Sequence, residues 1–159
     1  MKALVGKIFT FDAAHQLVGH KGKCANLHGH TYKLEVRLYG DVISREQSES
    51  DEGFVIDFSD LKEVVKKKVV DPMDHAFLAE GIEPALESLH LSGSKVCYLG
   101  FRSTCENMAA FICHRLKQYY PKLIHSVVLW ETPTSYAEVF ARDIPETGPN
   151  YSSSGGCDV

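Results

Sequence analysis

Two runs of alternating apolar residues that carry histidines on the same side constrain this chain more than any other feature. The first run spans 9–15, and the second spans 28–38. On a β-strand, residues two apart point to the same face of the sheet. Both runs therefore predict strands that bury one face and place imidazoles on it. The side chains on these faces are Phe9, Phe11, Ala13 and His15 in the first run and His28, His30, Tyr32, Leu34, Val36 and Leu38 in the second.

Three imidazoles that converge on a buried face are best explained by a metal ion. A single buried histidine is more often a hydrogen-bonded core residue, but two desolvated imidazoles in a His-x-His pair each need polar partners of their own. Zinc is the expected metal for all-nitrogen ligation. Three ligands, His15, His28 and His30, leave one position of a tetrahedral ion open, which is the catalytic pattern. The histidines without such a context are interpreted as surface or structural residues: His20, His90, His114 and His125.

The composition limits the class of protein. The 159 residues predict one domain over 1–143 and a flexible tail at 144–159, which is rich in Gly, Ser and Pro. A net charge of −4 gives no basic patch, so neither nucleic acid nor a membrane surface is expected as a partner. No apolar stretch approaches the roughly 20 residues that span a bilayer, and the N-terminal apolar run is too short for a secretory signal. The five cysteines, odd in number and without a C-x-x-C pair, favour free thiols in a reducing cytoplasm.

The remaining patterns predict an α+β fold. Ser59 is the expected N-cap of one helix, and the capping-box spacing of Ser103 and Glu106 predicts the start of another. The segments 125–131 and 136–140 are typical of a β-hairpin. The order β-β-α-α-β-β indicates an antiparallel four-stranded sheet with two helices packed on one face. The exposed edges of such a sheet favour pairing with another subunit, so a homo-oligomer is expected.

Three residues are candidates for proton transfer. Cys24 lies in a loop rich in Lys and Gly, where it is either an ordinary small residue or a thiolate favoured by nearby cations and a metal. Asp74 and His75 follow a Pro at the start of a short helical turn. They are either surface residues or a pair in which the carboxylate orients and charges the imidazole as a general acid or base.

Three further residues are candidates for substrate binding. Glu131 ends an otherwise apolar strand, so it is either a solvated strand end or a carboxylate at the mouth of a pocket. In a pocket its two oxygens would accept from adjacent N–H donors of a ligand, in a bidentate geometry. Thr104 and Glu106 have capping roles at the predicted helix start as their simplest explanation.

Taken in order, these residues resemble the 6-pyruvoyl-tetrahydropterin synthase/6-carboxytetrahydropterin synthase family. A strand-to-helix junction at 53–62 is also similar, and its Asp57-Phe58 looks more like the bacterial carboxytetrahydropterin enzymes of queuosine synthesis than the animal pyruvoyl enzymes. The matching motifs span nearly the whole chain except the tail. They are F-x-A-A-H at 11–15, C-x-x-x-H-G-H at 24–30, D-H-x-x-L at 74–78, S-T-x-E-N at 103–107 and E-T at 131–132.

The resemblance implies a T-fold, or tunnelling fold, in which the sheets of several subunits join into a barrel, commonly as a hexamer of two stacked trimers. It implies conversion of 7,8-dihydroneopterin triphosphate to 6-carboxy-5,6,7,8-tetrahydropterin with loss of triphosphate and acetaldehyde. The residue roles that it implies are zinc ligation by His15, His28 and His30, proton transfer by Cys24, Asp74 and His75, and pterin binding by Glu131 with Thr104 and Glu106.

Several alternatives remain open. The 6-pyruvoyl-tetrahydropterin synthase reaction uses the same residues and stops after triphosphate elimination and rearrangement. A metal-dependent cupin oxygenase would use Glu35 beside the His-x-His pair, although Glu35 has the opposite strand parity. A non-catalytic zinc- or pterin-binding module would keep the histidines and be indifferent to Cys24. The acidic loop at 44–52 and the segment at 79–102 are expected additions to the family pattern, and they bear on the product if they border the pocket.

Overall fold

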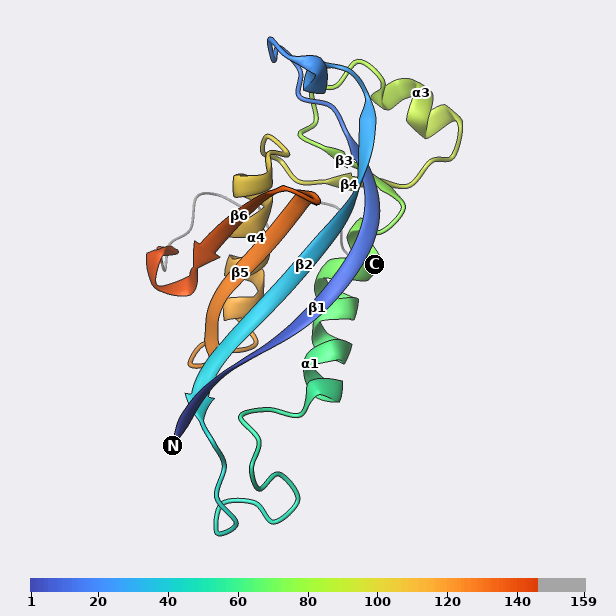
Figure 1. Cartoon of the computed structure of the whole chain (residues 1–159). Helices are drawn as coiled ribbons and strands as arrows, with labels where there is room; N and C mark the ends of the chain where they lie inside the picture. The colour runs from blue at the N-terminus through green and yellow to red at the C-terminus, as the bar shows by residue number, and fades with distance from the viewer. Residues whose placement is uncertain (146–159) are drawn as a thin grey trace.

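The computed structural model describes residues 1–145, which are organised around one curled six-stranded sheet (Figure 1). The strand order is β4-β3-β1-β2-β5-β6. The two longest strands, β1 (Lys2–His15) and β2 (His28–Asp41), pair antiparallel along their whole length. Their alternating pattern agrees with the two strands predicted from the sequence, and both end or begin at the predicted histidines, but β1 begins earlier than the predicted run, at Lys2.

The strands outside this central pair are of two kinds. On the β2 side, β5 (Ile124–Thr132) and β6 (Ser135–Phe140) form the predicted antiparallel hairpin. On the β1 side, β3 (Ala76–Ala79) and β4 (Val96–Tyr98) run parallel to β1. The predicted four-stranded antiparallel sheet is therefore wrong in strand number and in type. The missed strands have only four and three residues, and β3 is buried at every position, so it carries no alternation to recognise.

The two predicted helices are both present, with caps that differ from those expected. The first, α1 (Phe58–Val65), begins after Asp57, whose carboxylate accepts the N–H of Ser59 at 2.6 Å, so Asp57 and not Ser59 is the N-cap. The second, α4 (Cys105–Lys117), is capped by Thr104. A π-helical turn, η2 (Lys66–Val70), and α2 (Asp71–Met73) continue α1, and the other short helices are η1 (Lys23–Ala25), α3 (Leu86–Leu91) and η3 (Ala141–Asp143).

The core lies between one face of the sheet and the helices α1 and α4. The inward positions of β1 and β2 are the ones predicted from the alternation, and they end at the fully buried His15. Removal of apolar surface from water stabilises such a layer by about 25 cal/mol for each Å² buried, and this is its main stabilising contribution. Its most deeply buried members are Tyr32, Leu34, Leu38, Leu61, Met73, Leu78, Met108, Ile112, Leu116 and Leu129.

The two ends of the β1–β2 pair carry different features. At one end His15 lies opposite His28, and at the other Lys2 lies opposite Asp41. The acidic loop at 44–52 follows the second end and extends away from the sheet there (Figure 1). It therefore lies far along the strands from the histidines, and within one chain it does not border them.

Two sequence-based expectations concern the limits of this domain. Ile144 is buried in the core cluster and Pro145 is exposed, whereas residues 146–159 of the tail predicted to be flexible lie outside the described residues. Within residues 1–145, no helix has the length and apolar character needed to cross a bilayer.

Candidate metal centre and pocket

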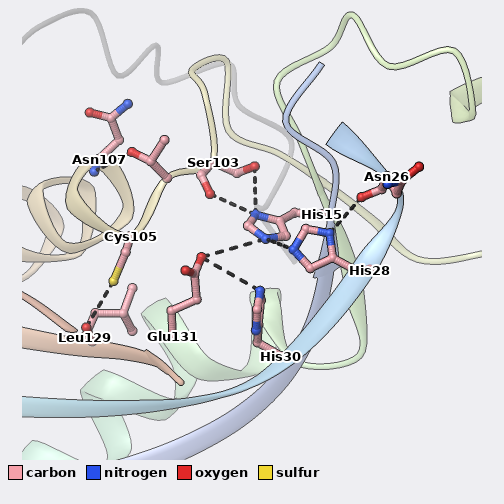
Figure 2. Close-up of polar contacts among 10 residues, drawn as sticks. His15, Asn26, His28, His30, Ser103, Cys105, Asn107, Leu129 and Glu131 are labelled. Carbon is pink, nitrogen blue, oxygen red and sulfur yellow. Dashed lines mark hydrogen bonds and ion pairs between the residues drawn. The ribbon is translucent and has the colours of Figure 1, made fainter. Parts of the chain in front are cut away.

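The three predicted zinc ligands converge at one end of the sheet (Figure 2). The register places His15 opposite His28, and His30 opposite Ala13 two residues earlier on β1. Nε2 of His15 lies 3.1 Å from Nε2 of His28, and one ring nitrogen from each of the three residues lies within 4.8 Å of the others. We call His15, His28 and His30 the histidine triad. Strand parity and register are sufficient to assemble it.

The hydrogen bonds of two triad members define which ring nitrogens carry protons. Nδ1 of His15 lies 2.9 Å from the carbonyl oxygen of Ser103, and Nδ1 of His28 lies 2.7 Å from the carbonyl oxygen of Asn26. A carbonyl oxygen only accepts hydrogen bonds, so both Nδ1 atoms must donate. In the neutral rings the two Nε2 atoms then face each other with unprotonated lone pairs, 3.1 Å apart. This arrangement is repulsive unless a cation lies between the rings.

Burial of the triad supports the same interpretation. Desolvation lowers the pKa of His15 to about 4, although its hydrogen bond to Ser103 acts in the opposite direction. Desolvation also lowers the pKa of His30. Nε2 of His30 is buried and has no hydrogen-bond partner among the described residues. Neutral imidazoles with unused nitrogen lone pairs are the donor set that zinc prefers, so the residues present fit this metal.

Glu131 borders the histidine triad from β5. Its Oε1 lies 3.8 Å from Nε2 of His15 and 3.9 Å from Nε2 of His30, and these distances are too long for hydrogen bonds (Figure 2). The side chain is about one-quarter exposed. Its carboxylate therefore keeps acceptor capacity for a ligand beside the metal position.

A cavity of about 230 Å³ lies beside Glu131 and brings the remaining predicted binding residues together. Its lining includes Cys24, Thr104, Glu106 and Glu131, together with Cys105. The sequence could not show that Cys24, from the loop after β1, faces the start of α4. The structure thus brings the predicted nucleophile or base and all three predicted binding residues to one pocket.

Several residues of this site were missed by sequence reasoning. The sequence pattern predicts Ser103 as part of a capping box, but its carbonyl and hydroxyl face His15 instead, with Oγ 3.2 Å from Nδ1. Thr104 caps the helix, accepting the N–H of Asn107 at 3.4 Å, so the proposed capping box is wrong. The apolar, helical surroundings of Cys105 in the sequence predict a core residue, yet it lines the pocket and donates its thiol proton to the carbonyl of Leu129 at 3.1 Å. Burial raises the pKa of this thiol to about 11.

The oxidation states of the cysteines differ along the chain. Cys24, Cys105 and Cys113 are free thiols. Cys97 is part of a disulfide, so the expectation of free thiols throughout is wrong at this position. Counting the cysteines could not reveal it, because spacing gives no information on which sulfur atoms meet in space.

Asp74 and His75 form a second cluster, bonded to the backbone of Asp12 on β1 just before β3 begins. Asp74 Oδ1 lies 3.0 Å from Nδ1 of His75 and accepts the backbone N–H of Asp12 at 2.9 Å. Burial acts to raise the pKa of Asp74, but these two hydrogen bonds lower it overall. His75, Asp12 and Lys95 line a larger cavity of about 640 Å³, which does not include Cys24. A single chain therefore does not bring the three predicted proton-transfer residues into one pocket.

The comparison with protein families agrees with this fold. The family model described as 6-pyruvoyl tetrahydropterin synthase matches residues 4–142, so the chain belongs to that family. Its curled mixed sheet with few helices is the α+β T-fold of the solved structures that it resembles. The cupin alternative is wrong, because the fold is not a β-barrel and Glu35 pairs with Arg37 at 2.8 Å instead of joining the histidines.

Named relatives cover most of the chain. A Haemophilus influenzae protein named 6-carboxy-5,6,7,8-tetrahydropterin synthase is 48% identical over 141 residues, covering 84% of this chain and 96% of that protein. A Synechocystis protein of the same name is 36% identical over 138 residues, covering 87% and 93%. The solved structure of Caenorhabditis elegans 6-pyruvoyl tetrahydropterin synthase has a TM-score of 0.65 at 25% identity, covering 88% of this chain and 96% of that one.

Proposed function

We propose that this protein is a 6-carboxy-5,6,7,8-tetrahydropterin synthase. It would convert 7,8-dihydroneopterin triphosphate with loss of triphosphate and acetaldehyde, as a step in queuosine biosynthesis. The observation that carries this choice is the 48% identity to the H. influenzae protein of that name, over nearly its whole length. Glu131 lies beside the three clustered imidazoles and lines one cavity with the thiol of Cys24, so the groups that the reaction requires lie close together.

The histidine triad would hold Zn²⁺ through its three Nε2 atoms. When bound, the ion would supply an open position that chelates the side-chain hydroxyls of the substrate and polarises the developing carbonyl. The contribution of the chain is the orientation of the ligands. The carbonyls of Ser103 and Asn26 fix the rings of His15 and His28, so both lone pairs point at the same position.

Glu131 would anchor the pterin ring. Its carboxylate offers two acceptor oxygens that suit the adjacent N3–H and 2-amino donors of a pterin. Thr104 accepts a helix N–H through its hydroxyl oxygen, which leaves the hydroxyl proton to donate to the ligand. Glu106 lines the same cavity on the first turn of α4. The ring would thus be oriented with its side chain towards the triad.

Cys24 would remove a proton from the substrate side chain, and His75, held by Asp74, would exchange protons with a hydroxyl on the other side. Because one chain keeps these groups in separate cavities, we infer that a neighbouring subunit completes the site within a homohexamer. The outer face of β1 and β2 supports such an assembly, since it exposes Leu4, Ile8 and Tyr39 at 53%, 58% and 44%.

The test is to incubate the purified protein with 7,8-dihydroneopterin triphosphate, with and without a zinc chelator, and to identify products by mass spectrometry. We expect 6-carboxytetrahydropterin and acetaldehyde, in amounts that the chelator reduces. Cys24→Ala should lose turnover, whereas Cys113→Ala, which removes a buried thiol of α4, is the matched control that keeps it. No turnover by the metal-loaded protein would contradict the proposal and leave a non-catalytic zinc- or pterin-binding module.

The second candidate is 6-pyruvoyl-tetrahydropterin synthase, which uses the same residues and eliminates triphosphate without cleaving the side chain. The observation that favours it is the similarity to solved structures of that name from C. elegans and Plasmodium falciparum, each at 25% identity. Accumulation of the pyruvoyl product without acetaldehyde would select this candidate over the first.

A further inference from the structure

Lys95 reaches back across the sheet edge to the turn that carries Asp74 and His75. Its Nζ donates to the carbonyl oxygen of Asp71 at 2.6 Å and to that of Asp74 at 2.9 Å. Its own carbonyl accepts the N–H of Phe77 on β3 at 2.9 Å, which fixes its backbone beside that strand. One lysine from the segment at 79–102 therefore holds two successive parts of the turn.

The turn needs such support because its backbone is strained. His75 has a φ of +56°, and among residues 1–145 it is the only residue other than glycine with a positive φ. From the other side, Asp12 on β1 accepts the N–H of His75 at 2.7 Å and donates its own N–H to the Asp74 carboxylate. The turn is thus held between a strand of the sheet and the ammonium group of Lys95.

The imidazole of His75 shares a cavity with Lys95. The 640 Å³ cavity is lined by Asp12, His75 and Lys95, and the imidazole itself is 77% exposed. No packing of the ring fixes its direction, so its placement depends on the backbone of the turn and on the Asp74 carboxylate. Loss of the two lysine hydrogen bonds would release one side of that turn.

We propose that Lys95 is a positioning residue, which holds the Asp74–His75 pair in the geometry needed for proton transfer. The inference rests on the proposed function, because it assigns His75 a part in the reaction. It gives the segment at 79–102 a role in catalysis through Lys95, which directly precedes β4. Lys95 acts through the turn and does not bind the substrate.

The first experiment compares steady-state kinetics of Lys95→Met and Lys95→Arg with the unmodified protein. We expect Lys95→Met to lower kcat about tenfold with KM within about twofold, since misplacement of a catalytic group affects the chemical step. Lys95→Arg should restore most of kcat, because a guanidinium can also donate to two carbonyls. Lys62→Met, on the exposed side of α1, is the control for loss of a lysine. Because Lys95 is exposed, the substitution removes no core contact.

A double-mutant cycle distinguishes this inference from the proposed function. If Lys95 acts through His75, Lys95→Met should cause no further loss of kcat in a His75→Ala background. A raised KM with unchanged kcat, or a full tenfold loss in that background, would overturn the positioning role. Normal kcat in His75→Ala would overturn the role of the pair in the proposed function. An impaired His75→Ala with an unaffected Lys95→Met would overturn the lysine inference alone.

Discussion

The histidine triad and the Asp74–His75 pair are assembled by different means. The triad lies on two long strands, and their register alone places His15 opposite His28. The pair lies in an exposed, strained turn before a four-residue strand, and it is held by Asp12 and Lys95 from distant segments. The comparison shows that a buried site can be fixed by strand pairing, whereas an exposed one needs individual tethers.

Removal of a triad ligand should eliminate metal binding and turnover. In His28→Ala, two nitrogens remain, which is too few to retain zinc against solvent, so the metal content should fall from about one per chain to near zero. Metal analysis of the purified variant measures this. His20→Ala removes an exposed histidine outside the triad and should retain the metal. Full zinc content and turnover in His28→Ala would show that the metal lies elsewhere.

The stability of the metal-free protein should depend on pH through the buried imidazoles. Because the pKa of His15 is about 4 when folded and 6.5 when unfolded, the unfolded state binds more protons between these values. The contribution of His15 to the free energy of unfolding is therefore fully present above pH 6.5. It falls by about 3 kcal/mol as the pH is lowered towards 4. Urea unfolding at several pH values measures the slope. His15→Gln should reduce it, and an unchanged slope would contradict the burial argument.

Loss of the second cluster should impair chemistry without affecting the metal. His75→Ala should lower kcat by roughly a hundredfold, the usual contribution of a general acid or base, while zinc content stays at the level of the unmodified protein. Kinetics and metal analysis on the same preparation separate the two regions. Loss of zinc in this variant would mean that the two regions are coupled, which contradicts the comparison.

The smallest effect is expected at Asn26. His28 donates to the backbone carbonyl of Asn26, and the side-chain amide is directed to Lys23 instead. Asn26→Ala keeps the carbonyl, so zinc affinity should change by less than about threefold, compared with the 10- to 100-fold loss typical when a ligand's outer partner is removed. Competition with a chelator measures the affinity. A larger loss would show that the loop conformation depends on the side chain.

The parts of the molecule that the sequence predicted are those set by local periodicity. The alternation along β1 and β2 places three imidazoles on one face, and the β5–β6 hairpin follows from its own pattern. The parallel strands β3 and β4 could not be recognised, because three or four residues are too few to show a period. Contacts of Ser103 with His15 and of Lys95 with Asp74 also escaped prediction. They join segments 88 and 21 residues apart, and no spacing rule reports such pairs.

In the proposed enzyme the histidine triad holds zinc while the fourth position stays open and Cys24 stays unligated. X-ray absorption at the zinc edge of the purified protein distinguishes this arrangement from its alternatives. We expect three nitrogen ligands at about 2.0–2.1 Å and one further light atom from solvent. A sulfur ligand at about 2.3 Å would show that Cys24 occupies the open position, and it would contradict the role of that thiol as a base.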